Sequence, residues 1–301
     1  MKIIDFHAHW WPSDRFTHSR QAWKSFIRRL NEMYYKTVNV HVTDEELEDF
    51  FFDPEGTKTL GRMDEAGVDK AVLLPLDWAG VNGSPEGDVM EQNEAYCRLA
   101  QRYPDRFIPF FSIDPERADA GPLFSKAATE WGMKGLKLYP PTGFYPDDPC
   151  CSPLYEVCLD RGLPVVFHGT TSPLSDEPYC HPDGFRRLAG RYPALKIVIA
   201  HAGGRDWFTA AAQACLDCEH IYLDISGFQS LLDPELFKSA VEMVHSTLTS
   251  FEKVLFGTDS PIFNRMCPIR DMVANLKAAD IPEREKANLF CNTGRKILGM
   301  I

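Results

Sequence analysis

Two histidines near the N-terminus, His7 and His9, stand two residues apart at the end of the apolar run Ile3–Phe6. Side chains of a strand alternate between its two faces, so both imidazoles are expected to project from the same face. Two imidazoles about 7 Å apart along a strand can close on one metal ion if the strand end bends slightly. The same pattern is also typical of ordinary hydrogen-bonded histidines, so the interpretation depends on whether later strands end in further ligands.

Three later apolar runs end in residues of the same chemical kind, namely His168, His201 and Asp259. In a parallel barrel the carboxyl ends of all strands lie on one rim, so these three residues are expected to converge with His7 and His9. Neutral imidazoles with one oxygen donor form the ligand set that a borderline metal such as zinc prefers. The sequence therefore predicts a metal centre at the barrel mouth.

The elements that position these residues follow an alternation of short apolar or β-branched runs with longer helical patterns. The predicted strands are Lys2–His7, Lys70–Leu76, Arg106–Ile113, Lys134–Tyr139, Leu163–His168, Leu195–His201, His220–Ser226 and Lys253–Asp259. Eight such units indicate an α/β fold of the (β/α)₈ TIM barrel type. A doubly wound sheet is the alternative, but it would normally carry a Gly-rich phosphate loop after the first strand, where this chain has histidines and tryptophans.

An aromatic-rich insertion, residues 10–56, follows the first predicted strand. Strand-to-helix loops of a barrel lie on the active-site face, so the insertion is predicted to form a lid or a subunit contact, with simple packing on the barrel as the alternative. The last segment, Glu283–Leu298, is expected to pack as one or two helices, with Asn292 capping a restarted helix. No linker rich in Pro, Gly or Ser divides the chain, which favours one domain over residues 1–301.

The composition sets limits on partners and compartment. The 301 residues carry a formal net charge of −11, and no basic cluster offsets it, so neither nucleic acid nor an anionic membrane surface is an expected partner. No apolar run reaches the roughly 18 residues that span a bilayer. The nine cysteines are expected to be reduced thiols in a cytoplasmic protein.

Several motifs resemble the amidohydrolase superfamily and, within it, the "amidohydrolase 2" branch that includes aminocarboxymuconate-semialdehyde decarboxylase. The matching motifs are His7-Ala-His9, Lys134-Gly-Leu-Lys137-Leu-Tyr-Pro, Phe167-His168, Ala200-His201-Ala-Gly-Gly and Phe256-Gly-Thr-Asp259. The resemblance implies that one divalent metal, usually zinc and alternatively manganese, is bound by His7, His9, His168 and Asp259. It also implies that His201 is the unligated acid/base.

Further residues are weaker candidates for contact with the substrate or the ligands. Lys137 ends the fourth predicted strand and is interpreted as a residue that supports the site or binds a substrate carboxylate, with carboxylation to hold a second metal as the alternative. Asp224 and Asp5 are candidates to orient histidines, with an ordinary hydrogen-bonded carboxylate as the alternative for Asp224. Candidates to hold a substrate carboxylate are Arg15, His18, His41, Arg205 and Trp207.

The predicted function is that of a metal-dependent hydrolase that attacks a small organic acid ester, lactone or amide through a metal-activated water, with His201 and Asp259 as catalytic residues. The alternative is a non-oxidative decarboxylase of an aromatic or muconate-like acid that uses the same metal site. A third hypothesis, a non-catalytic metal-binding barrel, predicts that His201 is dispensable. The expected partner is a small-molecule carboxylate, and a homodimer through the Trp-rich insertion is a further hypothesis.

Overall fold

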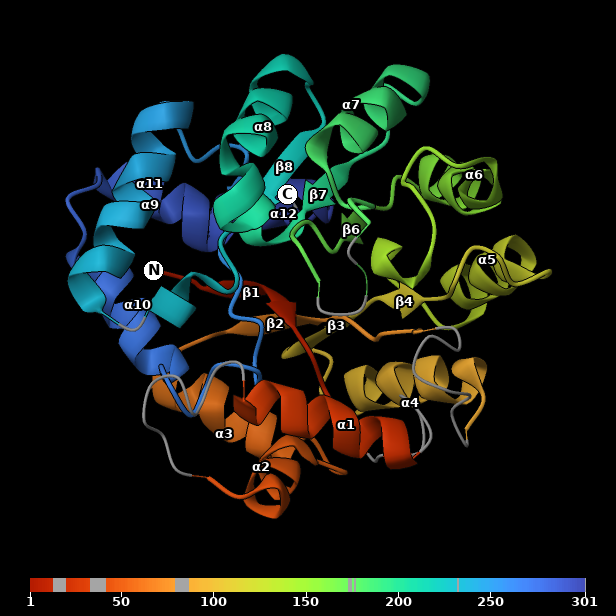
Figure 1. Ribbon diagram of the computed structural model, residues 1–301, viewed down its shortest axis with the longest axis horizontal. Helices are drawn as coiled ribbons and strands as arrows, with labels where there is room; N and C mark the ends of the chain where they lie inside the picture. Colours follow the sequence, from red (N-terminus) through yellow and green to blue (C-terminus); the bar gives the residue numbers. More distant parts are fainter. Residues whose placement is uncertain are drawn as a thin grey trace.

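The computed structural model describes residues 1–12, 20–32, 42–78, 87–172, 175, 177–231 and 233–300 (Figure 1). In these residues the strands are β1 (Ile4–Ala8), β2 (Lys70–Leu73), β3 (Phe107–Pro109), β4 (Phe111–Ser112), β5 (Leu136–Leu138), β6 (Val165–Phe167), β7 (Ile197–Ile199), β8 (Ile221–Asp224) and β9 (Val254–Leu255). Every pairing between successive strands is parallel, in the orders β1-β2-β3 and β4-β5-β6-β7-β8-β9. β3 and β4 are two parts of one predicted strand, interrupted only at Phe110.

Backbone contacts between the first and last strands close the sheet. Ala8 forms a parallel bridge with Ser260, and the His9 amide donates to the Ser260 carbonyl at 2.7 Å. The Phe6 amide likewise donates to the Phe256 carbonyl at 2.8 Å. The predicted TIM barrel is therefore confirmed, and the ends of β1 and β9 lie side by side.

Helices surround the strands (Figure 1), as the alternation predicts. They are α1 (Arg20–Leu30), α2 (Asp44–Phe51), α3 (Thr57–Ala66), α4 (Val89–Arg102), α5 (Ala120–Glu130), α6 (Ser152–Arg161), α7 (Pro182–Arg191), α8 (Gly204–Asp217), α9 (Pro234–Leu248), α10 (Ile269–Ala278), α11 (Glu283–Ala287) and α12 (Thr293–Ile297). The prediction that Asn292 caps a restarted helix is wrong. Its backbone is helical and a π-helical turn, Asn288–Asn292, joins α11 to α12, so the segment continues rather than restarts.

The strands bury side chains on both faces, as a parallel barrel requires. One cluster lies between strands and helices and includes Leu73, Phe111, Ile197 and Leu223 with residues from most helices. A second cluster takes alternate strand residues that face the barrel interior, and the C-terminal helices contribute to it. The second cluster contains Ile4, Phe6, Val72, Leu74, Ile108, Phe110, Val166, Val198, Ala200, Tyr222, Leu255, Cys291 and Ile297. This dry interior leaves the polar chemistry to the carboxyl ends of the strands.

The segment between β1 and α3 contributes α1 and α2, which pack through aromatic side chains. Trp23 is fully buried, with its ring centroid 6.0 Å from that of Trp11 and 5.1 Å from that of Phe52. The same cluster includes Leu76 and Trp78, which follow β2. These contacts seat α1 on the carboxyl end of the barrel.

Two further observations concern the cysteines and the helices. All nine cysteines are free, and Cys215 of the Cys-x-x-Cys sequence is buried in α8, where its thiol donates to the Ile221 carbonyl at 3.3 Å. Among the described residues, no helix has the length and apolar character needed to cross a membrane.

Candidate metal centre

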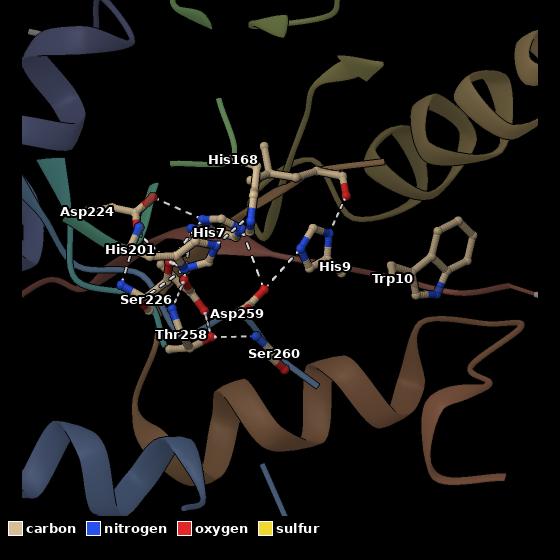
Figure 2. A network of polar contacts seen from close by, with 12 residues as sticks. His7, His9, Trp10, His168, His201, Asp224, Ser226, Thr258, Asp259 and Ser260 are labelled. Atoms are coloured by element: carbon tan, nitrogen blue, oxygen red, sulfur yellow. Dashed lines mark hydrogen bonds and ion pairs between the residues drawn. The ribbon is translucent and has the colours of Figure 1, made fainter. Parts of the chain in front are cut away.

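Three predicted ligands meet where β1 and the segment after β9 lie side by side. The Asp259 Oδ1 atom lies 3.0 Å from His9 Nε2 and 3.5 Å from His7 Nε2. Figure 2 shows Asp259 between the two imidazoles. One ligand atom from each of the three residues lies within 4.8 Å of the other two, and all three residues are buried. The pairing register of β1 with β2 shifts between Asp5 and Ala8, which bends the strand end and brings the rings together.

The outer nitrogen of each imidazole already has an acceptor. His9 Nδ1 donates to the Leu74 carbonyl at 2.6 Å, and His7 Nδ1 donates to Asp224 Oδ2 at 2.9 Å. The proton of each neutral ring is thereby placed on Nδ1, and Nε2 is left as a lone pair. The Nε2 lone pairs of His7 and His9 then face a carboxylate oxygen, so three acceptors meet with no donor among them.

The ligand atoms of His7 and Asp259 stay unprotonated at pH 7, which suits binding of a metal cation. Burial lowers the pKa of His7 to about 4, so that ring stays neutral at pH 7, and its Nε2 is buried without a hydrogen-bond partner. Burial alone would raise the pKa of Asp259, but the neighbouring histidine rings hold that pKa well below its usual range. Two imidazole nitrogens and a carboxylate oxygen fit a divalent metal such as zinc.

His168 and His201 form the adjacent part of the centre. His201 Nδ1 lies 3.1 Å from the Ser226 carbonyl, and His201 Nε2 lies 3.2 Å from His168 Nδ1. His168 Nε2 lies 3.4 Å from the Thr171 carbonyl. Two carbonyls thus place the ring protons on the outer nitrogens, and two inner lone pairs face each other. Desolvation lowers the pKa of His168 well below its ordinary value, so this pair also lacks a donor.

The structure therefore brings together all five residues predicted for the centre, but in two groups. Among the described residues, the candidate group around Asp259 consists of His7 and His9, and His168 contacts His201 instead. The ring centroids of His7 and His201, 5.1 Å apart, connect the groups. The roles of His168 as fourth ligand and of His201 as acid/base stay predictions.

Two of these residues adopt left-handed backbone conformations, which side chains with a Cβ rarely adopt. The φ angles are +60° for His201 and +52° for Asp259. The His201 amide donates to Asp224 Oδ1 at 3.0 Å, and the Asp259 amide donates to the His7 carbonyl at 2.7 Å. Such strain, of order 1–3 kcal/mol for each residue, persists where surrounding contacts determine the geometry and is common at functional sites.

Asp224 and Asp5 both support the centre, by different contacts. Burial alone would raise the pKa of Asp224, but the contact with the His7 ring, which donates to Asp224 Oδ2, holds that pKa below the usual range. Asp5 accepts from the amides of His7 at 3.1 Å and Thr258 at 3.0 Å, so it ties the two strand ends rather than a ring. Burial raises the pKa of Asp5 to about 7.

A cavity of about 790 Å³ opens over these residues. His7, His9, His168, His201 and Asp259 all line it. The remaining lining mixes aliphatic, hydroxyl and acidic residues with a group of aromatic and cationic side chains. That group consists of Phe26, Arg29, Trp78, Lys137, Tyr139, Arg205, Phe208, Phe228 and Phe263. The cavity therefore offers ring faces and positive charges next to the candidate metal centre.

Lys137 is the buried cation of this cavity, with only 1% of its surface exposed. Burial lowers the pKa of its amine to about 8, although the carboxylates of Asp224 and Asp259 act in the opposite direction. Among the described residues its Nζ makes no hydrogen bond or ion pair. The amine is thus available to a ligand, and its role as a substrate-binding residue stays a prediction.

The weaker candidates separate clearly. Arg205 lines the cavity, whereas Trp207 is not among the lining residues and packs on the His181 ring at 5.7 Å. Arg15, His18 and His41 lie outside the described residues.

Sequence reasoning missed Arg29, which lines the cavity from α1. Its spacing of three residues from Phe26 was the available signal, because residues three apart share one face of a helix. Phe26 lines the same cavity.

Comparison with known proteins agrees with the barrel fold. The fold is similar to that of 5-carboxyvanillate decarboxylase from Novosphingobium aromaticivorans with bound manganese and 4-hydroxy-3-methoxy-5-nitrobenzoic acid, with a TM-score of 0.71 and 18% identity over 99% of this chain and 96% of that chain. It is also similar to a probable 2-pyrone-4,6-dicarboxylic acid hydrolase from Acinetobacter baumannii with bound citric acid, with a TM-score of 0.66 and 15% identity over 99% of this chain and 100% of that chain.

A third similar structure is 4-oxalomesaconate hydratase from Rhodopseudomonas palustris, with a TM-score of 0.62 and 19% identity over 99% of this chain and 95% of that chain. No curated protein matches the sequence. The family model described as Amidohydrolase (Amidohydro_2) matches residues 4–300. The match covers every strand of the barrel and every residue of the candidate centre, so this chain belongs to the amidohydrolase family and is an enzyme of that family.

Proposed function

We propose that this protein is a metal-dependent hydrolase that acts on an ester, lactone or amide of a small organic acid. The observation that carries the proposal is the meeting of three acceptor atoms, His7 Nε2, His9 Nε2 and Asp259 Oδ1, beneath a cavity that also holds a buried amine. When bound, a divalent cation supplies Lewis-acid chemistry, because it polarises a carbonyl oxygen and lowers the pKa of water toward about 7.

Each residue of the centre has a role in this proposal. His7, His9 and Asp259 hold the metal, and His168 completes the set. His201, which lines the cavity and whose Nε2 lies 3.2 Å from His168 Nδ1, takes a proton during attack and returns it to the leaving group. Asp259 also accepts a hydrogen bond from the attacking water.

The cavity walls suit an acidic substrate. Lys137 and Arg205 both line the cavity and supply positive charge, and a substrate carboxylate offers the acceptors that both lack. The rings of Trp78 and Tyr139, whose centroids lie 6.1 Å apart, form an apolar wall that limits access of water.

Non-oxidative decarboxylation of an aromatic or muconate-like acid is the second candidate. The aromatic wall favours it, because a planar ring packs well against other rings. The similarity to a decarboxylase solved with a nitrobenzoic acid supports the same class of ligand. In this reaction His201 donates a proton to the ring carbon before carbon dioxide leaves.

One experiment tests the metal and separates the two reactions. The protein is stripped with a chelator, reloaded with zinc or manganese, and assayed on lactones such as 2-pyrone-4,6-dicarboxylic acid and on hydroxybenzoic acids in ¹⁸O-labelled water. A hydrolase incorporates ¹⁸O into the product, whereas a decarboxylase releases carbon dioxide without it. Full activity of the metal-free protein would contradict the proposal.

The proposal has four further parts. The resident metal is zinc, residues 1–301 form one catalytic domain, the protein is a homodimer, and its location is cytoplasmic. Each part rests on a feature of the sequence: the metal on the imidazole-rich ligand set, and the single domain on the absence of a linker. The homodimer rests on the Trp-rich insertion, and the location on the odd number of cysteines. The metal content of protein purified without added metal, together with its mass in solution, tests the first and third of these.

A further inference from the structure

A serine without an assigned role lies between the two groups of histidines. Ser226 follows β8 and is fully buried, and its Oγ lies 2.9 Å from His201 Nδ1 and 3.1 Å from His7 Nδ1. The same hydroxyl donates to Asp224 Oδ1, and the Ser226 amide donates to that oxygen at 3.0 Å. Figure 2 shows Asp224 and Ser226 next to the rings of His7 and His201.

The hydrogen-bonding capacity of this hydroxyl is completely used. A serine hydroxyl has one proton and two lone pairs. The proton goes to Asp224, because an ionised carboxylate only accepts. The two lone pairs are then available to the two imidazole nitrogens, and both must arrive as Nδ1–H donors. Each Nδ1–H also faces a second acceptor, Asp224 Oδ2 for His7 and the Ser226 carbonyl for His201. The hydroxyl is the acceptor that both rings share, and it favours the same tautomer in both, with each Nε2 left as a lone pair.

Two glycines make the close approach of these groups feasible. A Cβ on Gly227, whose φ is +84°, would lie 3.3 Å from His201 Nδ1. A Cβ on Gly257 would lie 2.8 Å from the Cβ of His7 and 3.2 Å from that of Ser226. Side chains at either position would displace the imidazoles from the hydroxyl, so the local sequence accommodates this contact.

We infer that Ser226 is a positioning residue whose hydroxyl, as the acceptor shared by His7 and His201, holds the tautomer and orientation of both rings together with Asp224 and the Ser226 carbonyl, and so couples metal binding to the acid/base residue. The inference rests on the proposed function only for the roles of the two histidines. The tautomers themselves belong to the metal-free protein. Residues that orient metal ligands in this way typically change metal affinity about 10–100-fold when they are removed.

The test compares Ser226→Ala with a matched control, Ser112→Ala. Ser112 is also a buried serine at the end of a strand, and its hydroxyl accepts one hydrogen bond, from the Asp77 amide at 3.2 Å, without contact to a histidine. Both substitutions remove one buried hydroxyl, so a general loss of stability affects both. Ser226→Thr keeps a hydroxyl and serves as the rescue variant.

The first measurement is the tautomer of each histidine in metal-free, ¹⁵N-histidine-labelled protein by NMR, with His7→Asn and His201→Asn used for assignment. We expect pure Nδ1–H forms of His7 and His201 in the unmodified protein and in Ser112→Ala. In Ser226→Ala, a second tautomer or ring exchange is expected at His201, which keeps only the residue-226 carbonyl as acceptor. Unchanged, pure Nδ1–H forms in Ser226→Ala would overturn the inference.

The second measurement is zinc affinity by competition with a chromophoric chelator. We expect Ser226→Ala to bind zinc about 10–100-fold more weakly than Ser112→Ala, with recovery in Ser226→Thr. Equal zinc affinities of the two alanine variants would overturn the coupling. If the unmodified protein fails to bind zinc, the proposed function fails, whereas the NMR comparison still decides the role of Ser226.

Discussion

The two halves of the candidate centre differ in how completely the protein prepares them. In the half at the ends of β1 and β9, His7, His9 and Asp259 are all buried, and both rings have fixed Nδ1 partners. In the half at the ends of β6 and β7, His168 and His201 are partly exposed and contact each other. The difference teaches that the first half is a preformed set of acceptors, whereas the second is open to the cavity.

A substitution in the buried half, which contains Asp259, is expected to have the largest effect on metal content and activity. In Asp259→Asn, a neutral amide replaces the carboxylate, so the charge that attracts a divalent cation is lost. We expect loss of bound metal, measured by elemental analysis, and a fall in kcat/KM of at least about 10⁴-fold because the Lewis acid is absent. Metal content equal to that of the unmodified protein would contradict the proposed metal site.

A substitution in the open half, which contains His201, is expected to reduce turnover without removing the metal. His201→Asn keeps a polar side chain but cannot exchange protons, so kcat is expected to fall about 10²–10³-fold. Elemental analysis should show unchanged metal content, which distinguishes this variant from Asp259→Asn. Unchanged turnover with metal bound would remove His201 as the acid/base.

The pH dependence of stability measures how much the burial of the charged Lys137 amine destabilises the folded protein. The pKa of Lys137, about 8 in the folded protein, lies below the ordinary value of 10.5, so the unfolded chain binds more protons between these pH values. The free energy of unfolding of the metal-free protein should therefore rise as pH increases from about 8 to about 10.5. At about 1.4 kcal/mol for each pH unit, this rise is about 3 kcal/mol.

Lys137→Met should abolish that rise and stabilise the metal-free protein by up to about 3 kcal/mol at pH 7. Denaturant titrations at a series of pH values measure this difference. Lys134→Met is the control, because Lys134 is exposed on the same segment and should leave the pH dependence as it is. The same pH dependence in both variants would show that burial of Lys137 costs little.

The smallest expected effect is a change in KM when Arg205, on the cavity wall, is replaced. Arg205 lines the cavity and Trp207 does not. Arg205→Gln should raise KM for a carboxylate substrate about tenfold, because a hydrogen bond to a charged group contributes about 1.5–3 kcal/mol. Trp207→Leu should leave KM within about twofold. The reverse order of the two KM values would indicate that Trp207, rather than Arg205, meets the substrate.

Much of the fold could be predicted from local patterns. The apolar runs marked the strands, and helices such as α4 (Val89–Arg102) and α10 (Ile269–Ala278) follow strands as the alternation predicted. The interruption at Phe110 and the π-helical turn at Asn288–Asn292 could not be predicted, because both depend on packing against neighbouring elements rather than on residue type.

The sequence by itself determined which residues end the strands, and therefore which five side chains reach the barrel mouth, because side-chain direction and parallel alignment are local properties of strands. Only the tertiary structure decided the contacts among them: barrel closure brings Ser226 and Asp224 to His7 across 219 and 217 residues of sequence, and it turns His168 toward His201. Such contacts arise from packing between distant segments, and no spacing along the chain encodes them.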